Sequence, residues 1–243
     1  MPPSVFRHTP AHTVAIIPVL NEAQSIGKVL DDIPRDWVDR VIVVDNGSHD
    51  GSPQIAHAHG AEVYHEPERG YGAACLRGLA ALPPETRYIV FLDGDYSDYP
   101  EECALLLDPL VRQQADLTLG SREQGTREQG ALTPQARFGN WLATHLIALR
   151  WGHTFTDLGP FRAIRRDALD ILDMRDRNYG WTVEMQIKAV LAGLRILEVP
   201  VRYRIRIGQS KVSGTLKGVI GAGSKILWTI GRFALTLPNH RLK

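Results

Sequence analysis

The chain has 243 residues, of which 44% are hydrophobic and 23% are charged. This composition is ordinary for a globular protein and is sufficient for a sizeable core, in one large domain or two small ones. The net charge of +1 gives no reason to expect a nucleic-acid-binding protein. No stretch of the sequence has the uncharged length that a membrane-spanning helix requires.

The N-terminus and the two cysteines indicate where the protein is located in the cell. Met1 to His12 is rich in proline and lacks the apolar core of a signal peptide, so we expect a flexible segment at residues 1–12. Cys75 and Cys103 each lie in an expected helix. They are interpreted as reduced thiols of a cytosolic protein rather than as a disulfide or a metal-binding pair.

Apolar runs alternate with segments of helical periodicity through the first half of the chain. Short continuous apolar runs predict buried strands, at residues 14–17, 41–44, 61–65, 88–92 and 117–119. The intervening segments predict helices, at residues 22–33, 54–59, 70–82 and 101–113, with Asn21 as the N-cap of the first. Strands without polar alternation, separated by helices, indicate a parallel sheet covered on both faces. We therefore predict an α/β protein with a Rossmann-like, mostly parallel central sheet.

Asp93-Gly94-Asp95 directly follows the strand expected at residues 88–92. Two carboxylates two residues apart are costly to hold close together unless a cation neutralises them. Hard oxygen ligands suit Mg²⁺ or Mn²⁺, and such a site usually completes its shell with substrate phosphates. An acidic turn that caps the next helix is the simpler explanation of the same spacing.

Polar side chains also follow two other expected strands, as Asn21-Glu22 and Asp45-Asn46. A parallel sheet binds ligands outside the carboxyl ends of its strands. Because turns are polar in most proteins, one such cluster has little weight by itself. Three clusters at successive strand ends, all of carboxylates or amides, predict a binding site at this edge of the sheet.

Further motifs are arranged in chain order around these clusters. They lie at residues 17–22, 43–51, 69–74, 92–97, 120–122, 156–162, 180–185, 198–201 and 206–211. As an ordered set they resemble the family 2 glycosyltransferases of the GT-A fold, and among them the polyprenyl-phosphate sugar synthases of the dolichyl-phosphate mannose synthase type. The resemblance covers residues 13–213, taken as the catalytic domain, and leaves residues 214–243 as a helical tail.

The resemblance implies a site for a nucleotide-sugar donor. In the resembled family the second Asp of the acidic motif, here Asp95, is the direct metal ligand, and the first, Asp93, lies nearer the ribose and the metal-bound waters. Asp45 corresponds to a residue that accepts a hydrogen bond from the base, and Glu22 to one that faces the ribose or base. The other expected donor-binding residues are Pro18, Leu20, Asn21, Gly47, Gly70, Gly72 and Gly94.

Simpler explanations exist for these residues. Glu22 also lies in the first turn of an expected helix, where the macrodipole favours a carboxylate. Asp45 is equally suited to an Asx turn. Gly70 and Gly72 allow an anionic ligand to approach a helix N-terminus, but close packing of that helix explains them as well.

Basic residues near the end of the catalytic domain are candidates for phosphate binding. In relatives, the residues that correspond to Arg206 and Lys211 clamp the diphosphate or the acceptor phosphate, as a bidentate fork and a point charge. A solvated basic face is the alternative, because Arg202, Arg204 and Arg206 alternate as on the exposed side of a strand. Further candidates for holding the acceptor phosphate are Arg122, Arg137, Arg162 and Ser210.

The acceptor decides whether a general base is needed. A phosphate is already an anion and attacks unaided, whereas a sugar hydroxyl requires a base. Asp157 and Glu184, the latter in a helix expected at residues 181–191, are the two candidates. With a phosphate acceptor they would orient the site, and Glu184 is also suited to capping its helix.

Residues 121–137 are polar and contain the tetrad Arg-Glu-Gln-Gly twice. Long loops without secondary structure in a compact domain are often lids, and the glycines fit a mobile flap over bound substrates. A plain surface excursion is the alternative.

The tail at residues 215–237 is apolar but carries three cations, Lys217, Lys225 and Arg232. On a helix these fall within one sector of roughly 80°. An apolar body with a basic stripe predicts an amphipathic helix that lies in the membrane interface. The alternative is a helix that packs on the catalytic domain or on a second subunit of a homodimer.

These observations together predict an inverting, metal-dependent glycosyltransferase that moves a hexose from UDP-glucose or GDP-mannose to a polyprenyl phosphate. Such an enzyme would be cytoplasmic and peripheral at the inner face of the membrane. One alternative is a glycosyltransferase that acts on a hydroxyl of a soluble or glycan acceptor. The other is a nucleotide-sugar-binding protein without turnover, against which the acidic pair and the basic residues argue.

Overall fold

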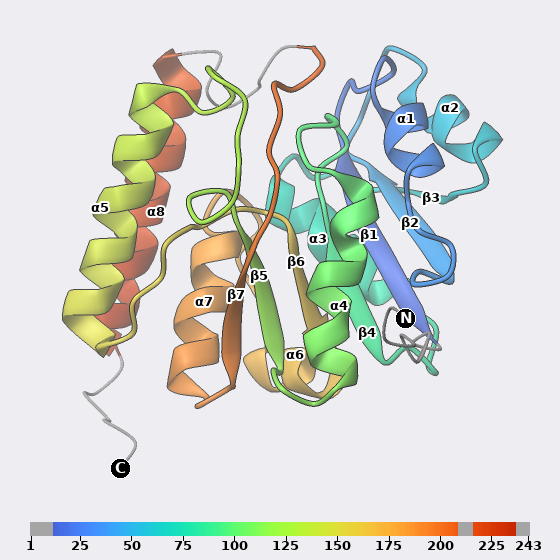
Figure 1. Ribbon diagram of the computed structural model, residues 1–243. Coiled ribbons are helices and arrows are strands. Elements are labelled where there is room, and N and C mark those ends of the chain that lie inside the picture. Colours follow the sequence, from blue (N-terminus) through green and yellow to red (C-terminus); the bar gives the residue numbers. More distant parts are fainter. Residues whose placement is uncertain (1–11, 209–215, 237–243) are drawn as a thin grey trace, which may run out of the picture.

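The computed structural model describes residues 12–208 and 216–236 (Figure 1). Its centre is a seven-stranded sheet in the order β3-β2-β1-β4-β6-β5-β7. The strands are β1 (Thr13–Val19), β2 (Arg40–Asp45), β3 (Glu62–His65), β4 (Tyr88–Phe91), β5 (Leu117–Ser121), β6 (Arg162–Arg165) and β7 (Ile196–Pro200). Only β6 is antiparallel to its neighbours β4 and β5 among these strands. The mostly parallel α/β sheet is therefore confirmed.

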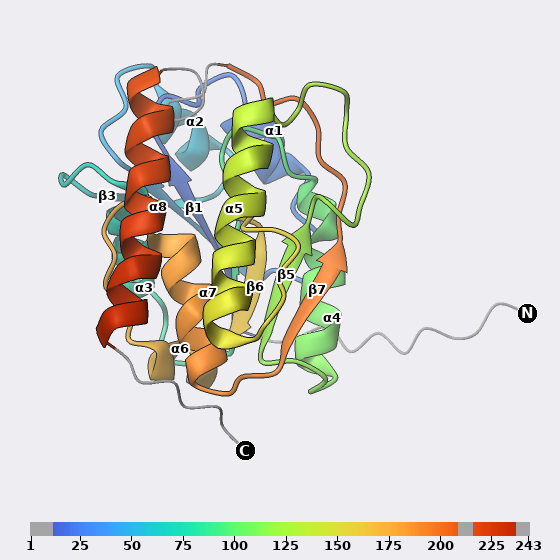
Figure 2. The same ribbon diagram turned by 90° about the vertical axis from the view of Figure 1, so that its left-hand side faces the viewer.

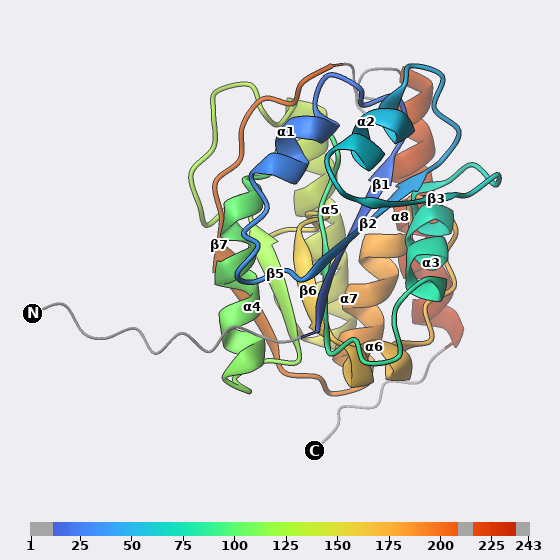
Figure 3. The same ribbon diagram turned by 90° about the vertical axis from the view of Figure 1, so that its right-hand side faces the viewer.

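Helices cover both faces of the sheet. They are α1 (Ile26–Asp31), α2 (Ser52–Ala58), α3 (Tyr71–Ala80), α4 (Cys103–Val111), α5 (Pro134–Trp151), α6 (Arg166–Leu172), α7 (Trp181–Leu191) and α8 (Leu216–Thr236), with a 3₁₀ turn at Pro100–Glu102 before α4. One face packs against α1, α2 and α4. In Figure 3, α4 lies to the left of β1 and α3 lies to its right. The other face packs against α3 and the group of α5 to α8.

The core follows from the alternation of side chains along each strand. In β1, Val14 and Ile16 face the α3 side, whereas Ala15 and Ile17 face the α1 side, and all four are fully buried. A strand that is buried on both faces has to be apolar throughout, which is the pattern seen in the sequence. Cys75 and Cys103 are buried and unpaired, as expected for reduced thiols.

The structure corrects the start of the first helix. Helix α1 begins at Ile26 with Ser25 as its N-cap, so Asn21 is not the N-cap as predicted. Residues 22–25 instead form a turn in which the N–H groups of Ser25 and Ile26 bond to the carbonyl of Glu22. Asn21 has a φ of 54°, outside the extended conformation of an N-cap residue.

The segment between β5 and α7 contains more structure than the sequence pattern predicted. Residues 134–137 of the expected flap are the first turn of α5, whose N-cap Thr133 accepts the N–H of Ala136. Strand β6 and helix α6 follow, and neither was assigned from the sequence. The helix expected at Trp181–Leu191 is confirmed as α7.

The tail forms α8, a single helix that lies alongside α5 and in front of α7 in Figure 2. Its Ile226 and Phe233 pack against the core, and Thr229 and Ile230 are buried. The packed arrangement that was the alternative for the tail is therefore present. None of the helices in the described part of the chain is long and apolar enough to cross a bilayer.

Candidate active site

A cavity of about 470 Å³ opens at the carboxyl ends of β1, β2 and β4, a size typical of ligand sites. Of the residues predicted to bind the donor, the metal or a phosphate, those that line it are Pro18, Leu20, Glu22, Gly70, Asp93, Gly94, Asp95 and Arg206. These come from distant parts of the chain, because parallel strands place their carboxyl ends on one edge of the sheet. The remaining lining residues are Val19, Asn46, Arg69, Tyr71, Ala74, Pro160, Asn178, Tyr179, Thr182 and Ile226.

Asp93 and Asp95 form the acidic centre of the cavity. Oδ1 of Asp95 accepts hydrogen bonds from the backbone N–H and the hydroxyl of Ser97, at 2.9 and 2.5 Å. Burial and the neighbouring charge of Asp95 raise the pKa of Asp93 to about 7. Oδ1 of Asp93 is buried without a hydrogen-bond partner in the described part of the chain.

This arrangement fits a divalent cation. A buried carboxylate oxygen without a partner is costly, and a cation would supply the missing partner and lower the repulsion between Asp93 and Asp95. Within residues 12–208 and 216–236, no group of three or more His, Cys, Asp or Glu side chains could hold a metal. The two carboxylates would therefore leave most of the coordination shell to donor phosphates and water, which is how Mg²⁺ is usually bound.

Arg206 bridges two carboxylates of the cavity. Its guanidinium lies 2.8 Å from Oε1 of Glu22 and 3.1 Å from Oδ2 of Asp95. All three side chains are largely buried, with the Arg206 side chain 24% exposed. The extended segment after β7 thus places the cation of Arg206 at the acidic centre. The alternation of arginines in the sequence could not separate this buried position from the alternative of a solvated basic face.

Asn46 joins the turn after β2 to the start of α3. Its amide donates to the carbonyls of Glu66 and Glu68 at 3.0 and 2.7 Å, and its carbonyl accepts the N–H of Gly70 at 2.8 Å. Arg69 in turn donates to the carbonyl of Asn46 at 2.8 Å. Asn46 therefore has a structural role at the edge of the cavity, which it also lines.

Four of the expected donor-binding residues do not line the cavity, namely Asn21, Asp45, Gly47 and Gly72. Asp45 accepts the N–H of Ser48 at 2.9 Å, as in an Asx turn. Burial by itself would raise the pKa of Asp45, but the hydrogen bonds from Ser48 and His65 outweigh it and lower the pKa.

The two glycines before α3 are explained by close packing. A Cβ atom on Gly70 would lie 2.0 Å from the carbonyl oxygen of Arg177, and one on Gly72 would lie 2.0 Å from that of Asp176. Real Cβ atoms do not approach backbone oxygens so closely. The packing alternative therefore accounts for both residues, and Gly70 lines the cavity in addition.

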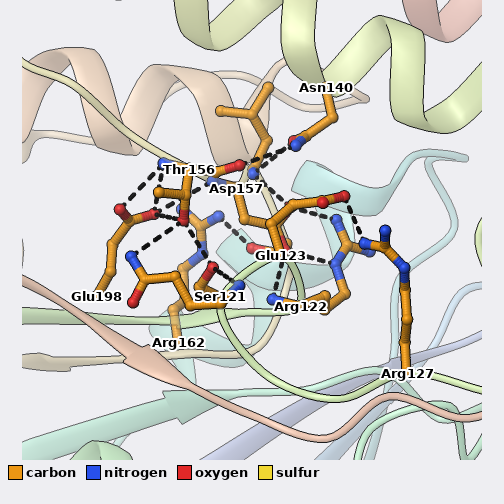
Figure 4. A network of polar contacts seen from close by, with 12 residues as sticks. Ser121, Arg122, Glu123, Arg127, Asn140, Thr156, Asp157, Arg162 and Glu198 are labelled. Carbon is orange, nitrogen blue, oxygen red and sulfur yellow. Dashed lines mark hydrogen bonds and ion pairs between the residues drawn. The ribbon is translucent and has the colours of Figure 1, made fainter.

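Asp157 lies in a buried polar network outside the cavity lining (Figure 4). Its carboxylate accepts the backbone N–H of Arg122 at 2.8 Å and two guanidinium bonds at 2.7 and 2.6 Å. Burial would raise the pKa of Asp157, but Arg122 outweighs it and lowers the pKa. Asp157 and Arg122 thus form a bidentate ion pair with each other. This pair would have to open before Asp157 could act as a base or Arg122 could bind a phosphate.

The rest of this network joins three elements. Glu198 of β7 accepts the N–H groups of Thr156 and Asp157, at 2.9 and 3.2 Å. Ser121 Oγ lies 2.6 Å from Oγ1 of Thr156, and the amide of Asn140 in α5 donates to the Thr156 carbonyl at 3.0 Å. The motif at residues 156–162 is therefore fixed to β5, β7 and α5.

Glu184 does not line this cavity. Its carboxylate accepts the N–H groups of Arg175 and Asp176 and lies 2.7 Å from Nζ of Lys188. It is 4% exposed and holds the segment between α6 and α7, so its position does not support a role as a base.

The acceptor-binding candidates are dispersed. Arg162 is 1% exposed and donates to the carbonyls of Gly159 and Thr182, and burial lowers its pKa to about 10. Arg137 lies exposed in the first turn of α5. Ser210 and Lys211 lie outside the described residues, as does nearly all of the expected flexible N-terminus.

The loop between β5 and α5 is attached to the segment after β7. Glu128 accepts the N–H of Ile205 at 2.8 Å, and its own N–H bonds to the carbonyl of Tyr203 at 2.9 Å. A Cβ atom on Gly125 would lie 1.9 Å from the carbonyl oxygen of Val201. The glycine at 125 thus allows two backbones to pack, and the mobile flap stays a prediction.

Sequence reasoning missed several lining residues, among them Tyr71, Asn178 and Tyr179. The motif at residues 180–185 came within two positions of Asn178 and Tyr179, but no local pattern indicates that the residues before it reach the cavity. Tyr71 and Arg69 lie within the glycine-rich motif at residues 69–74, and both line the cavity.

Comparison with known proteins agrees with this fold. The glucosyl-3-phosphoglycerate synthase of Mycobacterium tuberculosis, crystallised with Mn²⁺, UDP and phosphoglyceric acid, superposes with a TM-score of 0.72 over 94% of this chain and 80% of that one, at 22% identity. The fold is thus that of the GT-A glycosyltransferases. Residues 14–172 match the family described as glycosyl transferase family 2.

Two curated relatives are similar along most of their length. A dolichyl-phosphate hexose transferase of Haloferax volcanii is 34% identical over 195 residues, covering 79% of this chain and 82% of the relative. An undecaprenyl-phosphate mannosyltransferase of Micrococcus luteus is 30% identical over 224 residues, covering 86% and 89%. The chain belongs to glycosyltransferase family 2, and the protein is a glycosyltransferase.

Proposed function

We propose that the protein transfers a hexose, with inversion, from a nucleoside-diphosphate sugar to the phosphate of a polyprenyl phosphate, with Mg²⁺ or Mn²⁺ as cofactor. The observation that carries the proposal is the cavity in which Asp93, Asp95, Glu22 and Arg206 converge at the carboxyl ends of the strands. The two relatives whose names specify a polyprenyl-phosphate substrate support the acceptor.

Four residues of the cavity have parts in this reaction. Asp93 and Asp95 would hold the metal, which neutralises charge on the departing nucleoside diphosphate. Arg206 would bind the diphosphate through its forked guanidinium, for which an anionic ligand has to replace its present carboxylate partners. Glu22 would receive a donor hydroxyl, since a carboxylate is an acceptor of hydrogen bonds.

The positions of the two candidate bases favour a phosphate acceptor over a hydroxyl. Neither Asp157 nor Glu184 lines the cavity, and each is held by a cation and by backbone N–H groups. A phosphate oxygen needs no base to attack the anomeric carbon. A hydroxyl acceptor would require one of these carboxylates to leave its partners.

An acceptor in a membrane requires contact with the bilayer surface, and we assign this to α5 and α8, which lie side by side (Figure 2). Large apolar side chains stay exposed on both helices, and such side chains beside cations favour the membrane interface. They are Phe138, Trp141 and Leu149 on α5, and Leu227, Trp228 and Leu235 on α8. The enzyme would then be peripheral at the cytoplasmic face of the membrane.

A transfer assay tests the proposal. Radiolabelled UDP-glucose and GDP-mannose would be offered separately, with Mg²⁺ or Mn²⁺, to undecaprenyl phosphate in detergent, followed by organic extraction. We expect metal-dependent label in the organic phase from one donor, loss of that label in Asp95→Asn, and full label in Asp108→Asn, a matched control in an exposed ion pair of α4.

The other outcomes separate the alternatives. Metal-dependent donor hydrolysis without organic label would overturn the lipid acceptor and favour a soluble or glycan hydroxyl. Donor binding with neither transfer nor hydrolysis would favour a binding protein. Full activity of a folded Asp95→Asn variant would contradict the metal assignment.

A further inference from the structure

The segment at residues 173–180, which joins α6 to α7, forms one wall of the cavity. Asn178 and Tyr179 line the cavity from this segment. The carbonyl of Arg177 accepts the N–H of Ala73 in the first turn of α3 at 2.9 Å. The segment therefore lies against the helix start that was expected to bind the donor.

One carboxylate of the segment connects it to the C-terminal helix. Asp176 has an 8% exposed side chain, and its Oδ2 lies 3.0 Å from Nζ of Lys225 in α8. Its Oδ1 accepts the N–H of Asn178 at 2.7 Å and that of Gly180 at 3.1 Å. The same side chain thus sets the backbone of a cavity residue and meets a cation from 49 positions further along the chain.

The segment is also held from α7. Glu184 accepts the N–H of Asp176 at 2.6 Å and that of Arg175 at 3.1 Å. Lys188 donates to the carbonyl of Asp173 at 2.6 Å and pairs with Glu184 at 2.7 Å. These contacts fix the first half of the segment to the domain. The second half, which carries Asn178 and Tyr179, is held by Asp176 and by Arg177, whose side chain pairs with Glu68 at 2.6 Å.

Helix α8 borders two cavities that the segment separates. Ile226 lines the cavity described above, whereas its neighbour Lys225 lines a second cavity of about 710 Å³. Asp176 and Arg177 face the second cavity, and Asn178 and Tyr179 the first. A shift of α8 would therefore reach the candidate donor site by two routes, through Ile226 directly and through the pair of Lys225 and Asp176.

We propose that Asp176 and Lys225 are positioning residues, whose ion pair fixes Asn178 and Tyr179 against a bound nucleotide-sugar donor and makes tight donor binding depend on the packing of α8. The amide of Asn178 and the hydroxyl of Tyr179 supply the hydrogen-bonding groups. The inference rests on the proposed function, because it takes the cavity as the donor site.

Donor affinity and steady-state kinetics of the full-length protein test this inference. Titration calorimetry with Mn²⁺ and the donor accepted in the transfer assay is expected to show about tenfold weaker binding for Lys225→Gln and for Asp176→Asn, the range found for residues that couple two elements. The double variant should bind as weakly as either single variant, since both remove one interaction. Lys225→Arg should retain the affinity.

A matched control removes another contact of α8. Arg150 of α5 donates to the carbonyl of Ala234 at 2.9 Å, near the C-terminal end of α8 and nine positions after Lys225. Arg150→Gln should leave donor affinity unchanged. In the transfer assay, the KM for the donor should rise in Lys225→Gln and stay constant in Arg150→Gln, a difference that an equal loss of stability would not produce.

Each remaining outcome decides the question. Unchanged donor affinity in both Lys225→Gln and Asp176→Asn would overturn the inference and leave the proposed function intact. Equal losses in Lys225→Gln and Arg150→Gln, with a lowered unfolding temperature in both, would also overturn it, because they indicate general destabilisation. Failure of the unaltered protein to bind either nucleotide sugar would instead overturn the proposed function, and with it the premise of the inference.

Discussion

Replacing Arg206 with glutamine is expected to tighten the binding of a divalent metal to the donor-free protein. The guanidinium lies 3.1 Å from a carboxylate oxygen of Asp95 and 2.8 Å from one of Glu22. An incoming metal has to share Asp95 with this cation or displace it. Because both are positively charged, removal of the arginine charge leaves more negative potential for the metal.

The magnitude follows from the geometry. Two unit charges about 4 Å apart near a protein surface interact by about 4 kcal/mol. The Arg206 side chain is 24% exposed, so solvent screens part of this energy, and Asp95 retains its bonds to Ser97. We expect a net gain of about 1–2 kcal/mol, which is a metal affinity about 5- to 30-fold higher.

Titration of Mn²⁺ followed by electron paramagnetic resonance measures this affinity without any turnover. Arg204→Gln is the control, since Arg204 donates to the carbonyls of Tyr96 and Asp98 rather than to the carboxylates of the cavity. With a nucleoside diphosphate present the effect should reverse, because the variant lacks a phosphate ligand. Equal or weaker Mn²⁺ binding by the donor-free Arg206→Gln variant would refute the reasoning.

Two further predictions concern stability and membrane contact. Asp157→Asn should lower the free energy of unfolding by about 3–5 kcal/mol in urea titrations, because it leaves the Arg122 charge buried without its partner. The pKa of Asp157 is lowered in the folded state, so its contribution is present above its unfolded pKa of about 3.9 and is lost as the pH falls through the folded value. The variant should therefore lose less stability on acidification than the unaltered protein. An identical fall in the free energy of unfolding with pH in both proteins would contradict this account. Trp141→Ala, at an exposed position of α5, should weaken sedimentation with anionic vesicles several-fold. Ile171→Ala, at an exposed position of α6, should not. Equal vesicle binding by the unaltered protein and both variants would count against a membrane contact through α5.

The alternation of strands and helices in the first half of the chain was predictable from sequence. Continuous apolar runs such as 41–44 have no polar side, and only a sheet covered on both faces buries such a run completely. The predicted strands agree with the structure to within two residues at either end. The acidic motif after β4 could also be located, because its position depends only on the strand that precedes it.

The second half was less predictable because its elements lack a clear pattern. Strand β6 has four residues with arginine at both ends, and it is a strand because β4 and β5 lie on either side of it. Helix α5 carries apolar side chains toward both the core and the solvent, including the exposed Phe138 and Trp141. Such a distribution weakens the helical periodicity on which prediction depends.

The sequence by itself determined the family, the order of the first five strands along the chain and the acidic pair that marks the site. Only the tertiary structure decided which charged side chains reach that site. Glu184 and Asp157 have residue types suited to catalysis but are held elsewhere by backbone N–H groups and cations. Arg206 reaches Glu22 across 184 positions of the chain. Local sequence patterns follow from backbone geometry over a few residues, whereas pairings between distant charges depend on how the whole chain packs.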